Sequence, residues 1–243
     1  MKKIFSHLLS LLIVLVGLNS IYYSQSKTTE TNQNQIACEP NDFFLRLSNP
    51  QFANQMMSAM WTLSHDYSDF KRMEQVLNTS QKYFVAFEKN AKGDCSELKQ
   101  LGGIKAFKDQ LVIWLNDDDQ STRAYSAVML GISGDKSYSH QLASLLKKRK
   151  YKEKDLIQYD RGRAAMALGM IGATEYKQNL VELLKSINEF DRVGAVIGLG
   201  YLKAKDQIPV IKKLLKDKDE NVRQAVQEVL KLLGTSKSQK GKN

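Results

Sequence analysis

A glycine-rich stretch late in the sequence, RVGAVIGLG at residues 192–200, has the composition of a phosphate-binding loop. A dinucleotide-binding loop needs G-x-G-x-x-G between a strand and a helix, and a P-loop needs Lys followed by Ser or Thr after its last glycine. Here the order of the glycines is reversed, and Tyr201 follows Gly200. The stretch instead predicts a packed helix, because Gly194 and Gly198 stand four residues apart on one helical face, where a neighbouring helix can approach closely.

A second candidate is a calcium-binding loop. Asp217-x-Asp219-x-Asn221, with Glu228 at the twelfth position, has the ligand spacing of an EF-hand. The sixth position, where that loop needs glycine for its sharp turn, is Val222. We therefore predict that these acidic residues cap a helix, because Asp side chains accept hydrogen bonds from the N–H groups of a first turn. No metal and no cofactor is predicted.

Residues for acid–base catalysis are sparse. Of the three histidines, only His65 and His140 lie beyond the N-terminal apolar segment, and neither has a second candidate ligand near it in the sequence. The stretch LGISG at 130–134 lacks the G-x-S-x-G spacing of a nucleophile elbow. The sequence therefore predicts no catalytic residue and a non-enzymatic protein.

The strongest candidate for binding is a basic stretch, LLKKRKYKEKDLIQYD, at residues 145–160. Its charges and a tyrosine could contact phosphate, anionic lipid, acidic glycan or an acidic protein surface. The alternative is a solvated helix end, where cations interact favourably with the helix dipole. The candidate partner-binding residues are Lys147, Lys148, Arg149, Lys150, Tyr151, Lys152 and Lys154.

Repeated helices must position these candidates. Four arginines recur at spacings of 38, 31 and 31 residues, with leucine seven positions after each and glycine eight positions after the first three. The longer first interval contains the basic stretch, and insertions in repeat arrays tend to loop out on one face. The repeating residues are Arg123, Arg161, Arg192 and Arg223, with Gly131, Gly169 and Gly200.

The segments between the arginines also match. LVIWLNDDDQSTR at 111–123 superposes on VIKKLLKDKDENVR at 210–223, so each unit is a helix, a short turn and a second helix, with an acidic turn leading onward. We predict that Asp119 and Asp219 are N-caps. One unit cannot bury its apolar stripe alone, so the units must stack. The predicted fold is all-α, an α-solenoid of stacked antiparallel helix pairs. The predicted packing glycines are Gly131, Gly169, Gly194, Gly198 and Gly200.

Two segments carry a family pattern best, RGRAAMALGMIG at 161–172 and KDENVRQAVQEVLKLLG at 218–234. The pattern R-x-x-A-x-x-x-L-G-x-x-G, an apolar helix and D-x-D-x-x-V-R resembles HEAT-like repeats, of the short type also found in phycobilin lyases. The resemblance covers residues 104–234 and implies an armadillo-like α-solenoid. It leaves function open, because one fold hosts many activities. Deoxyhypusine hydroxylases, a metalloenzyme branch, use repeated His-Glu pairs that this sequence lacks.

The N-terminus has the layout of a secretory signal peptide, because Lys2 and Lys3 precede an apolar run that is followed by small residues. We predict a signal peptide over residues 1–26, with an uncleaved membrane anchor as the alternative. Both place the remainder outside the cytoplasm of a bacterium, in the periplasm or secreted. In that oxidising compartment Cys38 and Cys95 are predicted to form a disulfide.

Between the signal and the repeats we expect a flexible polar segment over 27–40 and N-terminal helical layers over 41–103. The aromatic and Met residues of those layers have helical spacing and are predicted to pack as a core. A disordered basic tail is expected over 235–243. The formal net charge of the whole sequence is +10.

These features favour an exported, non-enzymatic scaffold that binds a protein or peptide partner through its concave face. The second helices, over 138–150, 175–187 and 205–216, are expected to line that face. One alternative is a binder of nucleic acid or another anionic polymer through the basic residues 147–154, although export argues against nucleic acid. The other alternative is a lyase-like enzyme or maturation factor. A membrane tether is expected only if the N-terminal segment is not cleaved.

Overall fold

The computed structural model describes residues 43, 46, 70–147 and 158–234. These residues form helices joined by short turns, contain no strand and form the predicted all-α solenoid of packed helices. The chain divides into two compact units, residues 1–134 and 135–243. The predicted repeat region begins at residue 104 and therefore extends over both units. The segments predicted over 1–26, 27–40 and 235–243 lie outside the described residues.

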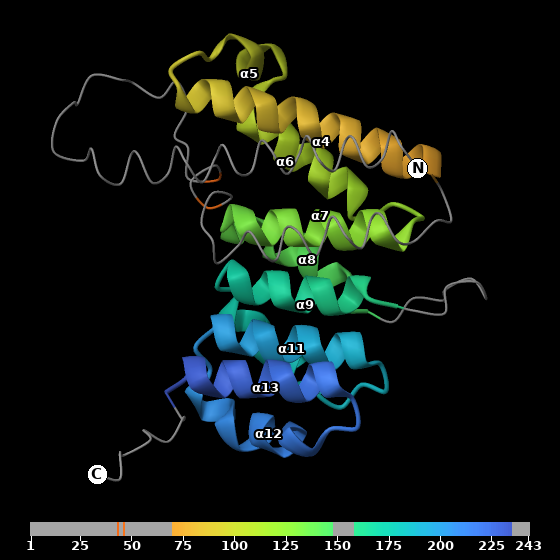
Figure 1. Cartoon of the computed structure of the whole chain (residues 1–243), viewed down its shortest axis with the longest axis vertical. Helices are drawn as coiled ribbons and strands as arrows, with labels where there is room; N and C mark the ends of the chain where they lie inside the picture. Colours follow the sequence, from red (N-terminus) through yellow and green to blue (C-terminus); the bar gives the residue numbers. More distant parts are fainter. Residues whose placement is uncertain (1–42, 44–45, 47–69, 148–157, 235–243) are drawn as a thin grey trace, which may run out of the picture. The chain divides into compact units, whose positions relative to one another are not determined.

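In the described part of unit 1, a long helix is followed by three shorter ones (Figure 1). The helices are α4 (Phe70–Ala91), α5 (Ser96–Gln100), α6 (Gly103–Trp114) and α7 (Gln120–Ser133). The last two pack against one another across the short turn between them. Asp119 caps α7, because its carboxylate accepts a hydrogen bond from the backbone N–H of Thr122 at 2.7 Å. This cap confirms the sequence prediction.

Aromatic side chains form the core of unit 1. The ring centroids of Tyr83 and Phe107 lie 4.7 Å apart, and Phe87 meets Phe107 edge to face at 5.8 Å. Phe43 packs on Phe87 at 5.6 Å, and Phe84 is also fully buried. Such rings bury large apolar areas and favour edge-to-face contacts. The aromatic residues that the structure describes here are therefore core residues.

Unit 2 is built from two layers of helices. The first layer contains α9 (Asp160–Met170), α11 (Glu189–Tyr201) and α13 (Glu220–Leu232), which lie side by side in chain order (Figure 1). The second layer contains α8 (Ser139–Ser144), α10 (Lys177–Leu183) and α12 (Ile208–Lys213). Each helix of the second layer packs on the first-layer helix that follows it in the chain.

Each second-layer helix begins with a 3₁₀ turn, and the first two end earlier than the sequence predicts. These turns are η1 (Lys136–Tyr138), η2 (Thr174–Tyr176) and η3 (Lys205–Gln207), and a further turn, η4 (Leu214–Lys216), follows α12. Together they give helical segments over 136–144, 174–183 and 205–216, against predicted ranges of 138–150, 175–187 and 205–216. The N-terminal 3₁₀ turns tighten the entry to each helix.

Glycines set the spacing within the first layer. A Cβ atom added at Gly194 would overlap the backbone of Gly162, and one added at Gly169 would overlap the backbone of Gly198. A Cβ at Gly198 would stand 2.5 Å from the carbonyl oxygen of Ala165. The backbones of α9 and α11 therefore touch along a line that only glycine permits. We call these four glycines the packing seam.

The other predicted packing glycines contact side chains or lie inside a helix. A Cβ at Gly200 would stand 2.8 Å from Cγ2 of Val229, so Gly200 leaves room for α13. Gly131 is buried within α7, and its carbonyl oxygen accepts a hydrogen bond from the N–H of Gly134 at 3.1 Å. Gly131 therefore belongs to the packing of unit 1, whereas Gly200 belongs to unit 2.

Cys95 immediately precedes α5 and is disulfide-bonded. Cys38, the other cysteine of the sequence, lies outside the described residues, so the predicted pairing stays a prediction. Among the helices that the structure describes, none combines the length and apolar character needed to span a bilayer.

Candidate binding site

A surface pocket lies in the second layer of unit 2, where α8 and the segment η2–α10 come together. Its volume is about 270 Å³. Ala143 and Leu146 supply apolar surface, and His140, Lys147 and Asn179 supply exposed polar groups. Ser144 and Tyr176 complete the lining. The pocket therefore combines hydrogen-bonding groups and a cation with a small apolar surface.

Buried leucines hold the helices of the pocket in place. Leu142 and Leu145 anchor α8 and the turn after it, and Leu180 anchors α10, each at most 2% exposed. At spacings of three and four residues, the remaining side chains of these short helices are directed away from the core. His140 and Asn179 consequently face solvent at the pocket.

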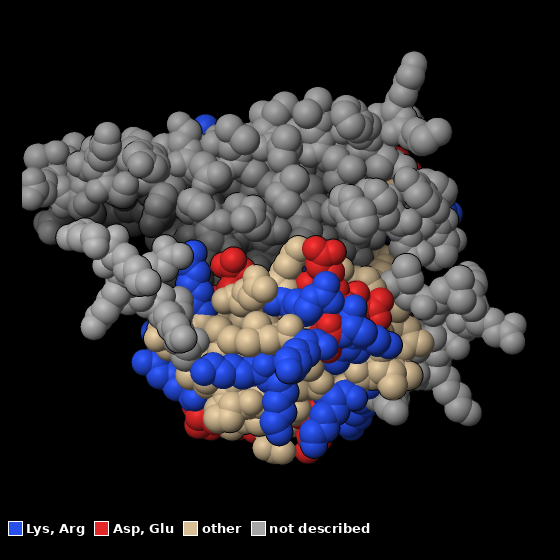
Figure 2. All heavy atoms as spheres, turned by 60° about the horizontal axis from the view of Figure 1, so that its bottom comes forward, with Lys and Arg blue, Asp and Glu red and all other residues tan. Residues whose placement is uncertain are grey.

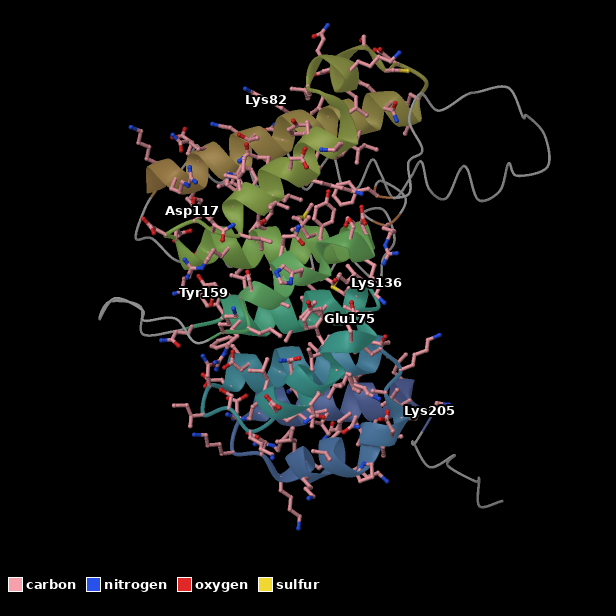
Figure 3. All side chains as sticks on the ribbon, turned by 180° about the vertical axis from the view of Figure 1, so that it is seen from behind. Lys82, Asp117, Lys136, Tyr159, Glu175 and Lys205 are labelled. Atoms are coloured by element: carbon pink, nitrogen blue, oxygen red, sulfur yellow. The ribbon has the colours of Figure 1, made fainter. Side chains whose placement is uncertain are left out.

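Charged pairs join successive repeats at one edge of unit 2. Lys136 and Glu175 lie 3.1 Å apart, N to O, and Lys177 and Asp206 lie 2.7 Å apart. Figure 3 places Lys136, Glu175 and Lys205 at this edge and Tyr159 at the opposite edge. These pairs are exposed to solvent and add little stability, so their main effect is to fix local geometry.

The opposite edge carries the turns that lead into the first-layer helices. Lys185, Lys216 and Lys218 are exposed near these turns, and Ile187 is 92% exposed. In the sequence, the basic stretch lies between α8 and α9. Of the seven predicted partner-binding residues, Lys147 lies in the described part, exposed at the pocket, whereas Lys148, Arg149, Lys150, Tyr151, Lys152 and Lys154 lie outside it.

Two of the repeating arginines form a ladder with acidic residues at or just before the start of the next first-layer helix. Arg161 pairs with Asp191, and Arg192 holds Asp217 with two hydrogen bonds, from Nε at 2.9 Å and from Nη2 at 2.7 Å. The side chains of Arg192 and Asp217 are only 5% and 7% exposed. In unit 1, Arg72 pairs with Asp117. In unit 2 the ladder, made of the Arg161–Asp191 and Arg192–Asp217 pairs, connects successive helix pairs by buried, charge-assisted hydrogen bonds.

Two opposing effects set the pKa of Asp217. Burial alone raises it, but hydrogen bonds from Arg192 and from the backbone N–H of Asp219, together with the positive charge of Arg192, lower it by more. The pKa of Asp217 therefore lies below its ordinary value. The carboxylate stays ionised at neutral pH, as the ladder requires.

This pKa predicts how the ladder responds to acid. Because the folded-state pKa of Asp217 is depressed, the stability it contributes is fully present above the unfolded value of about 4 and is lost as pH falls through the folded value. We expect the difference in melting temperature between wild type and Asp217→Asn to be constant from pH 7 to about 5 and to shrink below about 4. Thermal unfolding monitored by circular dichroism measures it. A difference that does not depend on pH would contradict this assignment.

The calcium-like spacing is explained by these contacts. Asp217 is paired with Arg192, and Asp219 accepts a hydrogen bond from the backbone N–H of Val222 at 3.1 Å, as the N-cap of α13. Both carboxylates therefore serve the fold, and the cap confirms the sequence prediction for Asp219. Within the described ranges, no three His, Cys, Asp or Glu side chains gather closely enough to hold a metal ion.

Comparison with known families agrees with the repeat geometry. A model described as PBS lyase HEAT-like repeat matches residues 160–186, and one described as HEAT repeats matches residues 188–240. Residues 160–240 belong to the HEAT-like repeat family. The first match spans α9 and α10, and the second includes α11, α12 and α13. No curated protein matches the chain.

The repeating arginines are visible in the sequence, but the pocket residues are not all visible there. The sequence marks His140 only as a catalytic or metal-ligating candidate, and Lys147 only as part of the basic stretch. Tyr176 and Asn179 give no signal, because their approach to α8 depends on how two short helices of neighbouring repeats are rotated. The sequence offers one hint of the pocket, because Tyr176 and Asn179 lie in the helical segment that follows the longest repeat interval.

Proposed function

We propose that this HEAT-like repeat scaffold binds an acidic segment of a protein partner, without catalysing a reaction. The observation that carries the proposal is the pocket that α8 and η2–α10 form between two successive repeats. The pocket lies on the second layer of helices, where we also place the binding face.

The size of the pocket supports recognition of a side chain within a longer contact. Sites for whole small molecules usually enclose about 300 to 1,000 Å³ and bury most of the ligand. The pocket here is about 270 Å³ and opens among exposed residues. Ala143 and Leu146 suit the apolar part of one side chain, and the amine of Lys147 suits a carboxylate. The remaining contacts would come from the surface around it.

Charge supports an acidic partner. By sequence, residues 148–154 add five lysine and arginine side chains and one glutamate next to Lys147. Exposed charges around an interface accelerate association and select partners of opposite sign. Peptide binding by repeat proteins commonly uses such extended surfaces. We also propose export, on the basis of the predicted signal over residues 1–26.

The proposal is tested by capture of partners from the extracytoplasmic fraction with the full chain, followed by affinity measurement with each purified partner. Reversing Lys147, Lys148, Lys150 and Lys152 to Glu is expected to weaken binding at least about tenfold, or about 1.4 kcal/mol. The matched control reverses four exposed lysines of unit 1, namely Lys71, Lys82, Lys92 and Lys99, and should leave the affinity within about twofold.

Two further results would contradict the proposal. If every partner keeps its affinity after the charge reversal, the basic residues do not contribute to the binding site. Equal binding of single-stranded DNA, with a steep loss of affinity as salt rises, would favour the anionic-polymer alternative.

Filling the pocket with Ala143→Trp should also weaken binding of the protein partner, because the new side chain would occupy the apolar surface beside Lys147.

A further inference from the structure

Arg223 repeats the arrangement of Arg192 one helix pair later. Arg192 lies in the first turn of α11, and Arg223 lies in the first turn of α13. Nη1 of Arg192 donates to two carbonyl oxygens of the preceding turn at 2.8 and 3.1 Å, and Nη1 of Arg223 donates to the two equivalent oxygens at 2.8 and 3.1 Å. Each guanidinium group is therefore fixed in the same orientation relative to its own helix.

The two guanidinium groups differ in the contacts of their Nε and Nη2 atoms. Nε and Nη2 of Arg192 hold both carboxylate oxygens of Asp217, which belongs to the following turn. In the part of the chain that the structure describes, Nε and Nη2 of Arg223 have no hydrogen-bond partner, and Arg223 is half-exposed. The ladder thus presents a donor pair without its carboxylate.

The surface around Arg223 is basic. Figure 2 views this end of unit 2, where Lys and Arg side chains predominate over Asp and Glu. The exposed lysines of the elements at this end are Lys212, Lys213, Lys216, Lys218 and Lys231. Two exposed leucines, Leu215 at 40% and Leu232 at 64%, add apolar area. An acidic ligand would therefore be attracted to the surface that contains Arg223.

We propose that Arg223 is a carboxylate-binding residue that takes an Asp or Glu side chain from an acidic segment of a partner protein. The carboxylate would occupy the position that the next turn supplies for Arg192. The planar donor pair matches a carboxylate in a bidentate manner, and the two backbone contacts hold it in place before the ligand arrives, which lowers the cost of binding. This site is on α13 and does not depend on the pocket of α8 and α10.

A carboxylate is favoured over a phosphate because the ladder provides two internal examples. Arg192 pairs with Asp217, which lies in the turn before α13, and Arg161 pairs with Asp191, which lies in the first turn of α11. Both acids lie at or near the turn that precedes a first-layer helix. An acidic residue on a surface turn of the partner would reproduce that geometry.

The test uses the full chain and two fluorescent peptides, one rich in Asp and Glu and the other with Asn and Gln in their place. Fluorescence anisotropy should show binding of the acidic peptide, weakened about tenfold by Arg223→Gln. Arg223→Lys should also be weakened, because lysine keeps the charge but loses the paired donors. The matched control, Lys231→Gln, removes an exposed charge from the same helix and should change the affinity by about twofold or less.

A second measurement separates binding from any effect of Arg223 on folding. In the wild-type chain, the Nε–Hε NMR signal of Arg223 should shift as the acidic peptide is added, whereas that of Arg192 should not. The proposal is overturned if neither signal moves, if both peptides bind equally, or if a single-stranded oligonucleotide binds wild type and Arg223→Lys equally well. Reversing the charges of the lysines at 147–152 should leave the chemical-shift change of Arg223 unaffected. The experiment can therefore contradict the proposal for the pocket without contradicting the proposal for Arg223, and the reverse.

Discussion

Arg192→Met is expected to lower the free energy of unfolding by about 3 to 5 kcal/mol, because it leaves the buried carboxylate of Asp217 without its partner. Both side chains are almost fully buried, and Asp217 accepts two hydrogen bonds from the guanidinium group. The substitution also removes the donors that Arg192 supplies to the carbonyl oxygens of Ser186 and Ile187. Urea unfolding monitored by circular dichroism measures the loss.

The matched control is Lys177→Met, which breaks an ion pair of similar geometry in a different environment. Lys177 and Asp206 also link neighbouring repeats, at 2.7 Å, but their side chains are 40% and 54% exposed. Water already solvates both charges, so the loss should be much smaller than that of Arg192→Met. Comparable losses for Arg192→Met and Lys177→Met would mean that burial does not give the ladder its strength.

The double variant Arg192→Met/Asp217→Leu tests whether the unpaired charge of Asp217 causes the loss of stability. It removes the buried pair altogether and replaces it with apolar side chains. Such replacements are often neutral or stabilising, whereas removal of one partner is costly. We expect the double variant to recover most of the stability that Arg192→Met loses. If it is as unstable as the single variant, the ladder contributes through its backbone contacts and not through the charge pair.

The periodic features of the fold could be predicted from the sequence, because they depend on local chemistry repeated along the chain. Asp119 and Asp219 were identifiable as caps, since a cap contacts N–H groups only three residues away. The eleventh position after each arginine is also regular: Gly134, Gly172 and Gly234 have positive φ. Lys203 stands at the same position with φ 52°, so the backbone follows the repeat even where glycine is absent.

Features that depend on stacking could not be predicted in the same way. The partner of Asp217 is Arg192, 25 residues earlier, and the sequence allowed a cap or a cation as alternatives. Only the superposition of one helix pair on the next brings the two side chains together. The pocket has the same origin, since Tyr176 and Asn179 approach His140 across two repeats. Contacts within a repeat can be predicted from the spacing of residues in the sequence. Contacts between repeats can be predicted only when the rotation of each repeat relative to the next is known.

The packing seam could be predicted only in part from the sequence. The four-residue spacing of Gly194 and Gly198 predicted a close approach, but it did not identify the opposing residues. The structure places Gly162 opposite Gly194, and Gly169 with Ala165 opposite Gly198. Glycine in a helix costs about 1 kcal/mol relative to alanine. The close packing of α9 on α11 must therefore offset that cost at several positions.

Gly198→Leu is expected to lower the free energy of unfolding by about 3 kcal/mol, although leucine is the better helix former. Its Cβ alone would stand 2.5 Å from the carbonyl oxygen of Ala165 and 2.8 Å from Cδ2 of Leu180. The first of these neighbours is backbone and cannot rotate away, so α9 and α11 must separate. In thermal unfolding the melting temperature should fall by about 10 °C.

Val193→Leu provides the control, because it adds volume at a half-exposed position of the same helix. It should leave the melting temperature within about 2 °C of wild type, as expected for substitutions outside the core. An unchanged melting temperature for Gly198→Leu would show that the two helices can move apart at little cost. The close approach of their backbones would then be a consequence of the repeat stacking and not a condition for it. A large loss confined to Gly198→Leu would establish the seam as the contact that sets the spacing of α9 and α11.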